Sequence, residues 1–223
     1  TPTPAQVAAW VAAGTLDPLT NGTLTFLQIT DVHLTNPYRP GNGSVDLLNA
    51  GLGALASNYP SSAFLVDTGD THYGWNQAVW NAALSNVPFP SYLLLGNSDV
   101  SATLTLVEGL PPAPGLPVRS YKLDLGPALF FLLDSTLPGG HEGVLRNDQL
   151  LWIHQELAQT SNRFVFIAFH HTFNYLANQD AFRNLLEAHA PRQRLMFLLS
   201  GHTHTAAYYD RGTFHELVAD TFQ

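Results

Sequence analysis

Five short clusters of Asp, Asn and His residues carry the chemistry that this sequence suggests. Each cluster follows directly after a run of apolar residues. Burying carboxylate, amide and imidazole groups together is costly unless they are paired or bind a cation. Five such strand ends in one chain therefore predict a single metal centre along one edge of a sheet. The clusters are Asp31-Val32-His33, Gly69-Asp70, Gly96-Asn97-Ser98-Asp99, His170-His171 and Gly201-His202-Thr203-His204.

The residue types in these clusters suit two neighbouring cations. A carboxylate has two oxygens, so Asp70 can bridge two metal ions about 3.5–4 Å apart. Asn97 offers a neutral amide oxygen, which suits a cation that already has carboxylate ligands. Imidazole and carboxylate ligands without sulfur indicate Mn, Fe or Zn rather than Ca or Mg. The expected ligands are Asp31, His33, Asp70 and His204 for the first ion, and Asp70, Asn97, His170 and His202 for the second.

Length and composition limit the classes of protein to consider. The 223 residues fit one domain, 1–223, and no apolar run approaches the roughly 18 residues of a membrane span. The formal charge of −8, with nine Lys and Arg residues, argues against binding a nucleic-acid backbone or an anionic membrane. The absence of cysteine excludes disulfides, thiolate zinc sites and cysteine nucleophiles.

The compartment stays open between two alternatives. The chain begins with Thr1 rather than Met, so we expect that an upstream segment was removed. A cleaved export signal and a cleaved tag explain this equally well. The expected location is therefore the cytoplasm, or outside it after signal cleavage.

The elements that position the clusters alternate between strand and helix in the first half and at the end of the chain. This pattern favours an α/β layered fold with mixed sheets. Sites in open α/β sheets form beyond the carboxyl ends of strands, where all five clusters fall. The expected strands are 24–29, 64–67, 92–95, 118–125, 128–134, 164–169 and 195–200, with two more within 206–219. The expected helices are 4–13, 45–58 after an N-cap at Ser44, 77–85, 147–157 with Asn147 as N-cap, and 180–189.

The order of the clusters resembles the calcineurin-like metallophosphoesterase superfamily, whose signature runs DxH, GD, GNH(D/E), H and GHxH. The match runs from Asp31 to His204. The resemblance implies a four-layer αββα sandwich of two mixed β-sheets flanked by helices. It also implies two divalent metal ions bridged by Asp70, and a small-molecule phosphoester attacked by a hydroxide shared between them. The stretch 133–157 is similar to the class III cyclic nucleotide and glycerophosphodiester phosphodiesterase branch, through Gly143, Leu145, Gln149, Leu150 and Trp152.

Ser98 departs from the family pattern, because the GNH motif carries a histidine there that protonates the leaving group or holds the attacked phosphate. A serine hydroxyl is far too weak an acid to replace an imidazolium. Branches without this histidine resemble phosphodiesterases, which favours diesters over monoesters. The candidates for a replacement acid are His72 and His171. Asp99 is expected to accept a hydrogen bond that orients a ligand.

Three alternatives to a phosphodiesterase remain open. A phosphomonoesterase has the same ligands, and a non-catalytic metal-binding domain is favoured by Ser98 but opposed by the intact ligand set. Nuclease activity fits the chemistry but not the charge of −8. A homodimer is also an open expectation. Substrate choice is expected in the loops 35–43, 72–76, 101–117 and 136–146, with Tyr38, Arg39, Trp75 and His141 as candidate contacts.

Overall fold

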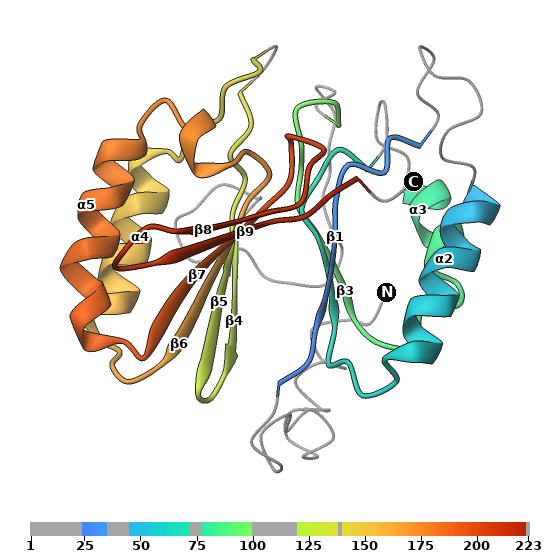
Figure 1. The fold of residues 1–223 in the computed structure, drawn as a ribbon, viewed down its shortest axis with the longest axis horizontal. Helices are drawn as coiled ribbons and strands as arrows, with labels where there is room; N and C mark the ends of the chain where they lie inside the picture. Colours follow the sequence, from blue (N-terminus) through green and yellow to red (C-terminus); the bar gives the residue numbers. More distant parts are fainter. Residues whose placement is uncertain (1–23, 35–44, 72–76, 100–119, 138–139, 222–223) are drawn as a thin grey trace.

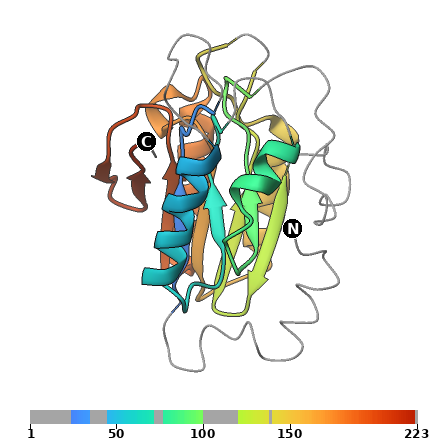
Figure 2. The same ribbon diagram turned by 90° about the vertical axis from the view of Figure 1, so that its right-hand side faces the viewer.

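Two β-sheets lie face to face, and a pair of helices covers the outer face of each (Figure 1). The computed structural model describes residues 24–34, 45–71, 77–99, 120–137 and 140–221. Helices α2 (Val45–Asn58) and α3 (Gln77–Ala83) cover the smaller sheet, and lie side by side over it in Figure 2. Helices α4 (Asn147–Ala158) and α5 (Gln179–His189) cover the larger sheet. The expected four-layer αββα sandwich is confirmed.

The smaller sheet has three described strands in the order β1-β2-β3. These are β1 (Leu27–Ile29), β2 (Leu65–Asp67) and β3 (Ser91–Leu93), and both pairings are parallel. Their carboxyl ends therefore lie at one edge of the sheet. The mixed pattern expected for both sheets appears only in the larger one among the described strands.

The larger sheet has six strands in the order β4-β5-β6-β7-β9-β8. The pairings between β5, β6, β7 and β9 are parallel, and the two outer pairings are antiparallel. The carboxyl ends of β6 and β7 thus share one edge. The bounds are β4 (Tyr121–Leu125), β5 (Ala128–Leu132), β6 (Phe164–Ala168), β7 (Leu195–Ser200), β8 (Ala207–Asp210) and β9 (His215–Val218), with short 3-10 helices η1 (Phe173–Tyr175) and η2 (Ala190–Arg192).

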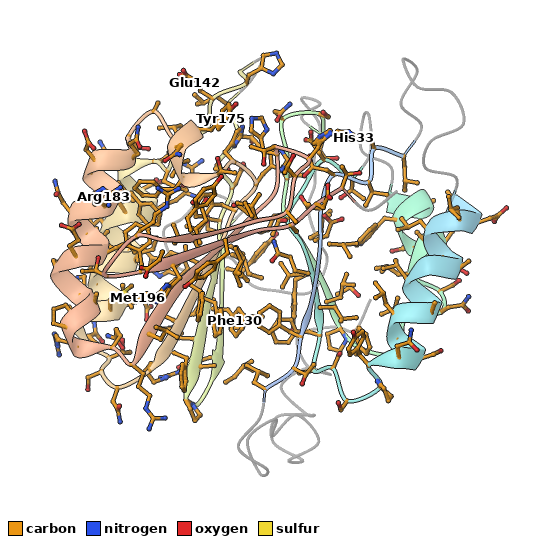
Figure 3. All side chains as sticks on the ribbon, viewed as in Figure 1. His33, Phe130, Glu142, Tyr175, Arg183 and Met196 are labelled. Atoms are coloured by element: carbon orange, nitrogen blue, oxygen red, sulfur yellow. The ribbon has the colours of Figure 1, made fainter. Side chains whose placement is uncertain are left out.

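Apolar side chains fill the spaces between all four layers. Phe130 lies between the two sheets, where its ring stacks 4.4 Å from Phe166 and meets Phe26 edge-on at 5.2 Å (Figure 3). Met196 lies on the other face of the larger sheet, in the cluster packed against α4 and α5. Sheets buried on both faces need continuous apolar strands, which explains the runs that precede the clusters.

The start of α4 differs from the expected N-cap at Asn147. Arg146 is the N-cap, and Asn147 is the first helical residue. The Gln149 side chain decides this boundary, because its Oε1 accepts the Arg146 N–H at 2.8 Å. Its Nε2 donates to the Ser120 hydroxyl at 2.8 Å, which ties the helix to the chain before β4.

The other predicted N-cap, Ser44, lies outside the described residues, as does the helix predicted at 4–13. Among the described residues, no helix combines the length and apolarity needed to cross a membrane.

Candidate metal centre

The structure brings the seven predicted ligands together at the common carboxyl edge of the two sheets. Three strands of the smaller sheet supply four of them: Asp31 and His33 follow β1, Asp70 follows β2 and Asn97 follows β3. The larger sheet supplies the other three, because His170 follows β6, and His202 and His204 follow β7. The site therefore spans the junction between the sheets.

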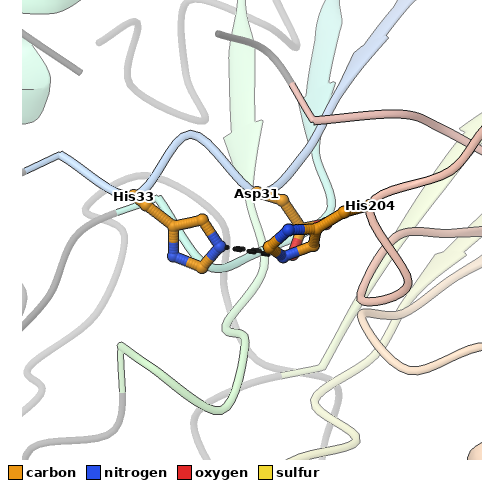
Figure 4. A group of neighbouring side chains, drawn as sticks. All are labelled: Asp31, His33 and His204. Atoms are coloured by element: carbon orange, nitrogen blue, oxygen red, sulfur yellow. Dashed lines mark hydrogen bonds and ion pairs between the residues drawn. The ribbon is translucent and has the colours of Figure 1, made fainter. Parts of the chain in front are cut away.

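Asp31, His33 and His204 form one group of converging ligand atoms (Figure 4). The Nε2 atoms of His33 and His204 are 3.0 Å apart. Asp31 Oδ1 lies 3.1 Å from His204 Nε2 and 3.7 Å from His33 Nε2. Two ligands about 2.1 Å from one cation lie about 3.0–3.4 Å from each other. The 3.0 Å and 3.1 Å spacings thus fit a single bound cation, and the 3.7 Å spacing between Asp31 and His33 is slightly longer.

Asp31, Asp70 and His170 form a second group. His170 Nε2 lies 3.6 Å from Asp70 Oδ1 and 3.2 Å from Asn97 Oδ1. His202 Nδ1 lies 3.3 Å from the same His170 atom. Asp31 belongs to both groups, whereas the motif order assigned it to the first one only. Donors of oxygen and imidazole nitrogen therefore surround two adjacent positions.

Asp70 lies between the two groups. Its Oδ1 is the oxygen nearest His170, and its Oδ2 lies 4.0 Å from His33 Nε2 in the first group. One carboxylate thus presents an oxygen to each position, as a bridging ligand does.

Five of the seven candidate ligands have left-handed backbone conformations. Among the described residues, Asn162 is the only other non-glycine residue with a positive φ angle. Such a conformation costs on the order of 1–3 kcal/mol at each residue and concentrates at functional sites. These strained conformations occur where the backbone turns the side chains of candidate ligands toward the centre. The φ angles are 53° for Asp31, 52° for His33, 55° for Asp70, 71° for His202 and 53° for His204.

Asp99 holds the turn that presents Asp70. Its Oδ2 accepts the backbone N–H of Asp70 at 2.7 Å and of Gly96 at 2.9 Å. The loops after β2 and β3 are thereby joined by a buried carboxylate that accepts hydrogen bonds from the backbone of both. Asp99 therefore positions the backbone that presents Asp70.

Asp67 supports the same turn and was not singled out from the sequence. It accepts hydrogen bonds from the Gly69 N–H at 3.0 Å and from the Thr71 hydroxyl. Complete burial raises the pKa of Asp67 well above its usual range, although these two hydrogen bonds oppose the shift. In the sequence Asp67 reads as the end of an apolar strand, so no pattern marked it.

Ser98 contacts Asp70 directly. Its hydroxyl donates to Asp70 Oδ2 at 2.8 Å, and its N–H donates to Oδ1 at 2.7 Å. The close approach needs a glycine at position 96, where an ideal Cβ would overlap the Asp70 carboxylate. Ser98 thus orients a carboxylate in this structure.

The electrostatics of the centre favour forms that can bind a cation. Burial lowers the pKa of His33, and burial together with the neighbouring charge of His170 lowers that of His202 to about 4. Burial alone would raise the pKa of Asp31, but hydrogen bonds from His204 and Thr30 and the charge of His170 lower it to about 2. Neutral imidazoles and an ionised carboxylate are the ligand forms of these groups. The donor set fits divalent cations.

His171 is buried next to the candidate ligands and forms a hydrogen bond with another protein side chain. Its Nδ1 is 2.9 Å from the Ser135 hydroxyl, and its Nε2 makes no hydrogen bond among the described residues. Burial, with the nearby charges of His170 and His202, lowers the pKa of His171 to about 3. This disfavours the imidazolium form that a general acid needs. The other candidate acid, His72, lies outside the described residues.

Tyr175 adjoins the centre and was missed by the sequence reasoning. Its ring lies 4.8 Å from the His202 ring, at an interplanar angle of 75°. It belongs to η1, too short a helix to show a periodic pattern. Of the candidate substrate contacts, His141 lines a pocket beside Tyr175. The remaining candidates, Tyr38, Arg39 and Trp75, lie outside the described residues.

The sandwich and its ligand cluster define a metal-dependent phosphoester hydrolase. The chain belongs to the calcineurin-like phosphoesterase family, whose sequence model matches residues 24–206. Membership of this family implies a dinuclear centre of divalent metal ions.

Three known proteins illustrate the similarity. A probable cyclic nucleotide phosphodiesterase from Synechococcus sp. is 30% identical over 202 residues, which cover 85% of this chain and 77% of that protein. A cAMP/cGMP dual specificity phosphodiesterase from Mycobacterium tuberculosis is 30% identical over 156 residues, 65% of this chain and 48% of that protein. The match thus spans about half of the mycobacterial protein. A dimetal phosphatase from Danio rerio shares the fold, with a TM-score of 0.66, 17% identity and coverage of 89% of this chain and 87% of that one.

Proposed function

We propose that this protein is a phosphodiesterase that hydrolyses cyclic nucleotides at a centre of two divalent metal ions. The observation that carries the proposal is the position of Asp70, with one oxygen toward each group of ligand atoms. The names of the two relatives at 30% identity support the substrate class. Ser98, in place of the family's histidine, supports a diester rather than a monoester.

The proposed ligands are the residues that converge at the sheet edge. Two divalent cations held there would lower the pKa of a water molecule and offset negative charge on the phosphoryl oxygens. The donors contain no sulfur, which favours Mn, Fe or Zn. The proposed set is Asp31, His33 and His204 on one side, Asn97, His170 and His202 on the other, and Asp70 between them.

The surrounding side chains keep these donors in place. Asp99 and Asp67 hold the backbone of the Asp70 turn, while Ser98 orients the Asp70 carboxylate. Burial keeps His33 and His202 neutral, so their nitrogen lone pairs are available. No imidazolium stands at position 98, so residue 98 does not supply a proton to the leaving oxygen. An oxygen that leaves as an anion makes the rate depend steeply on the pKa of the leaving group.

A side-by-side assay tests the proposed function. The protein is expected to hydrolyse 3′,5′-cyclic AMP and bis(p-nitrophenyl) phosphate with added Mn²⁺, and p-nitrophenyl phosphate more slowly. Treatment with EDTA should abolish both activities, because the donors hold cations rather than supplying a nucleophile, and Mn²⁺ should restore them. A faster rate on the monoester would make the protein a phosphatase. Metal binding without turnover of any ester would make it a non-catalytic domain.

Ser98→Ala separates positioning of Asp70 from proton donation. Loss of the hydroxyl contact to Asp70 is expected to lower activity by about tenfold, the low end for residues that orient a ligand. The logarithm of the rate, plotted against leaving-group pKa for a series of aryl phosphodiesters, should keep the steep slope of the native enzyme. A clearly steeper slope in Ser98→Ala would identify the serine as a proton donor and contradict the positioning role.

The expectations of a homodimer and of no nucleic-acid substrate, and the choice between cytoplasm and export, stay predictions.

A further inference from the structure

A pocket opens beside the metal centre, between the loop after β5 and the segment that contains η1. Its volume is about 610 Å³, within the range of about 300–1,000 Å³ that small-molecule sites occupy. In Figure 3 Glu142 and Tyr175 lie at the same end of the molecule as His33. The side chains that line the pocket include His141, Glu142, Asn174, Tyr175, Leu176 and Gln179.

Backbone hydrogen bonds join the two segments that form the walls of this pocket. Gly143 N–H donates to Tyr175 O at 2.9 Å, and Ala177 N–H donates to Gly143 O at 2.8 Å. Asn178 closes the ladder, since its Oδ1 accepts the Leu145 N–H at 3.2 Å. The pocket is therefore formed before a ligand arrives, which lowers the entropic cost of binding.

Tyr175 connects the pocket to the metal centre. Its ring contacts the His202 ring yet remains 46% exposed, so part of the ring is open to a ligand. A neighbouring network holds the same segment. Arg211 donates to Asn174 Oδ1 at 3.1 Å and pairs with the buried Glu216, which itself accepts the Phe173 N–H at 2.7 Å.

The lining has a chemical bias. It contains the imidazole of His141, the ring of Tyr175, amide groups of Asn174 and Gln179, and the carboxylate of Glu142, but neither Lys nor Arg. A second phosphate or another anion would meet the Glu142 carboxylate with no Lys or Arg in the lining to offset the repulsion. A planar, uncharged group with N–H donors at its edge would stack on the tyrosine and donate to the carboxylate.

We propose that this pocket binds the base of the nucleotide, with Tyr175 as its stacking residue and Glu142 as acceptor of a base amino group. The proposal rests on the proposed function, since the phosphate must lie at the metal centre while the base extends past His202. Stacking on an aromatic side chain accounts for a large part of base affinity and tolerates different bases. Tyr175 thus determines specificity for nucleoside esters over simple phosphate esters.

Calorimetry with two ligands tests the pocket. We would titrate manganese-loaded protein with AMP, which fills both sites, and with inorganic phosphate, which reaches only the metal centre. Native protein should bind AMP at least tenfold more tightly than phosphate. Tyr175→Ala should weaken AMP binding by about tenfold or more and change phosphate binding less than twofold. Tyr175→Phe should retain AMP affinity, because its ring still stacks.

Matched variants complete the experiment. Tyr59→Ala removes a similarly exposed tyrosine, 50% accessible, at the end of α2 and should change neither affinity. Glu142→Gln should weaken AMP and leave phosphate unaffected. Equal losses of AMP and phosphate in Tyr175→Ala, or no loss of either, would overturn the proposal. Failure of the proposed function would appear separately, as native protein that binds AMP but does not hydrolyse cyclic AMP.

Discussion

Asp70→Asn is expected to lower kcat/KM for a phosphodiester by on the order of 10³-fold or more. The substitution keeps the shape of the side chain but removes the charge and one of the two oxygens that face the ligand groups. Residues that merely orient a metal ligand contribute about 10–100-fold, so loss of the shared ligand should exceed that range. Rates with saturating Mn²⁺ measure the effect, and metal analysis should find fewer than two ions per chain.

Asp46→Asn is the matched control for that experiment. Asp46 is an exposed carboxylate in the first turn of α2, outside the ligand cluster. Its replacement removes the same charge and should leave activity within about twofold. A native rate in Asp70→Asn would refute the bridging role, and with it the proposed centre.

Gly201→Ala is expected to damage both stability and activity. An ideal Cβ at position 201 would overlap the Thr30 hydroxyl and lie 2.5 Å from Asp31 Oδ2. That oxygen accepts hydrogen bonds from Thr30 at 2.7 Å and from the His202 N–H at 2.8 Å, so the loop after β7 must move away from β1. Overpacking typically costs about 1–3 kcal/mol. We expect a loss of that size in urea unfolding, and a fall in kcat of about 10²-fold because ligands of the two sheets separate.

Gly53→Ala provides the opposite sign with the same atomic change. Gly53 lies within α2, and the nearest atom to an added Cβ is the Asn86 Cβ at 3.4 Å. Alanine in a helix interior is favoured over glycine by roughly 0.5–1 kcal/mol, so this variant should be slightly more stable and fully active. If Gly201→Ala matched Gly53→Ala in both the free energy of unfolding and kcat, the close packing of the two loops would not matter for the centre.

The sequence predicted most strands because their signals are local. The runs 164–169 and 195–199 are apolar throughout, as strands covered on both faces must be, and they correspond to β6 and β7. The predicted N-cap of α4 at Asn147 was wrong. The hydrogen bonds of Gln149 with Arg146 and with the distant Ser120 outweigh the intrinsic preference of asparagine for the N-cap position. The place of β9 between β7 and β8 could not be predicted, since it depends on pairing between segments without a distinguishing pattern.

The candidate site likewise contains residues that the sequence predicted and residues that it did not. Clusters such as Asp31-Val32-His33 and the motif order were sufficient to nominate the candidate ligands, because donor chemistry belongs to the residue type. Asp67 and Tyr175 escaped notice, since an aspartate at a strand end and a tyrosine in a short turn are ordinary in any sequence. The role of Asp67 depends on hydrogen bonds within its own turn, from Gly69 and Thr71, and that of Tyr175 depends on its contact with the distant His202.

The amino-acid sequence by itself determined which donors are available, that they follow buried strands, and that serine replaces histidine at position 98. Only the tertiary structure decided that Asp31 belongs to both ligand groups, that Ser98 donates to Asp70, and that His171 is buried against Ser135. The physical reason is one of range. Residue chemistry and strand periodicity act over a few neighbours along the chain, whereas contacts of about 3 Å between ligands of different strands and sheets arise only when those elements pack together.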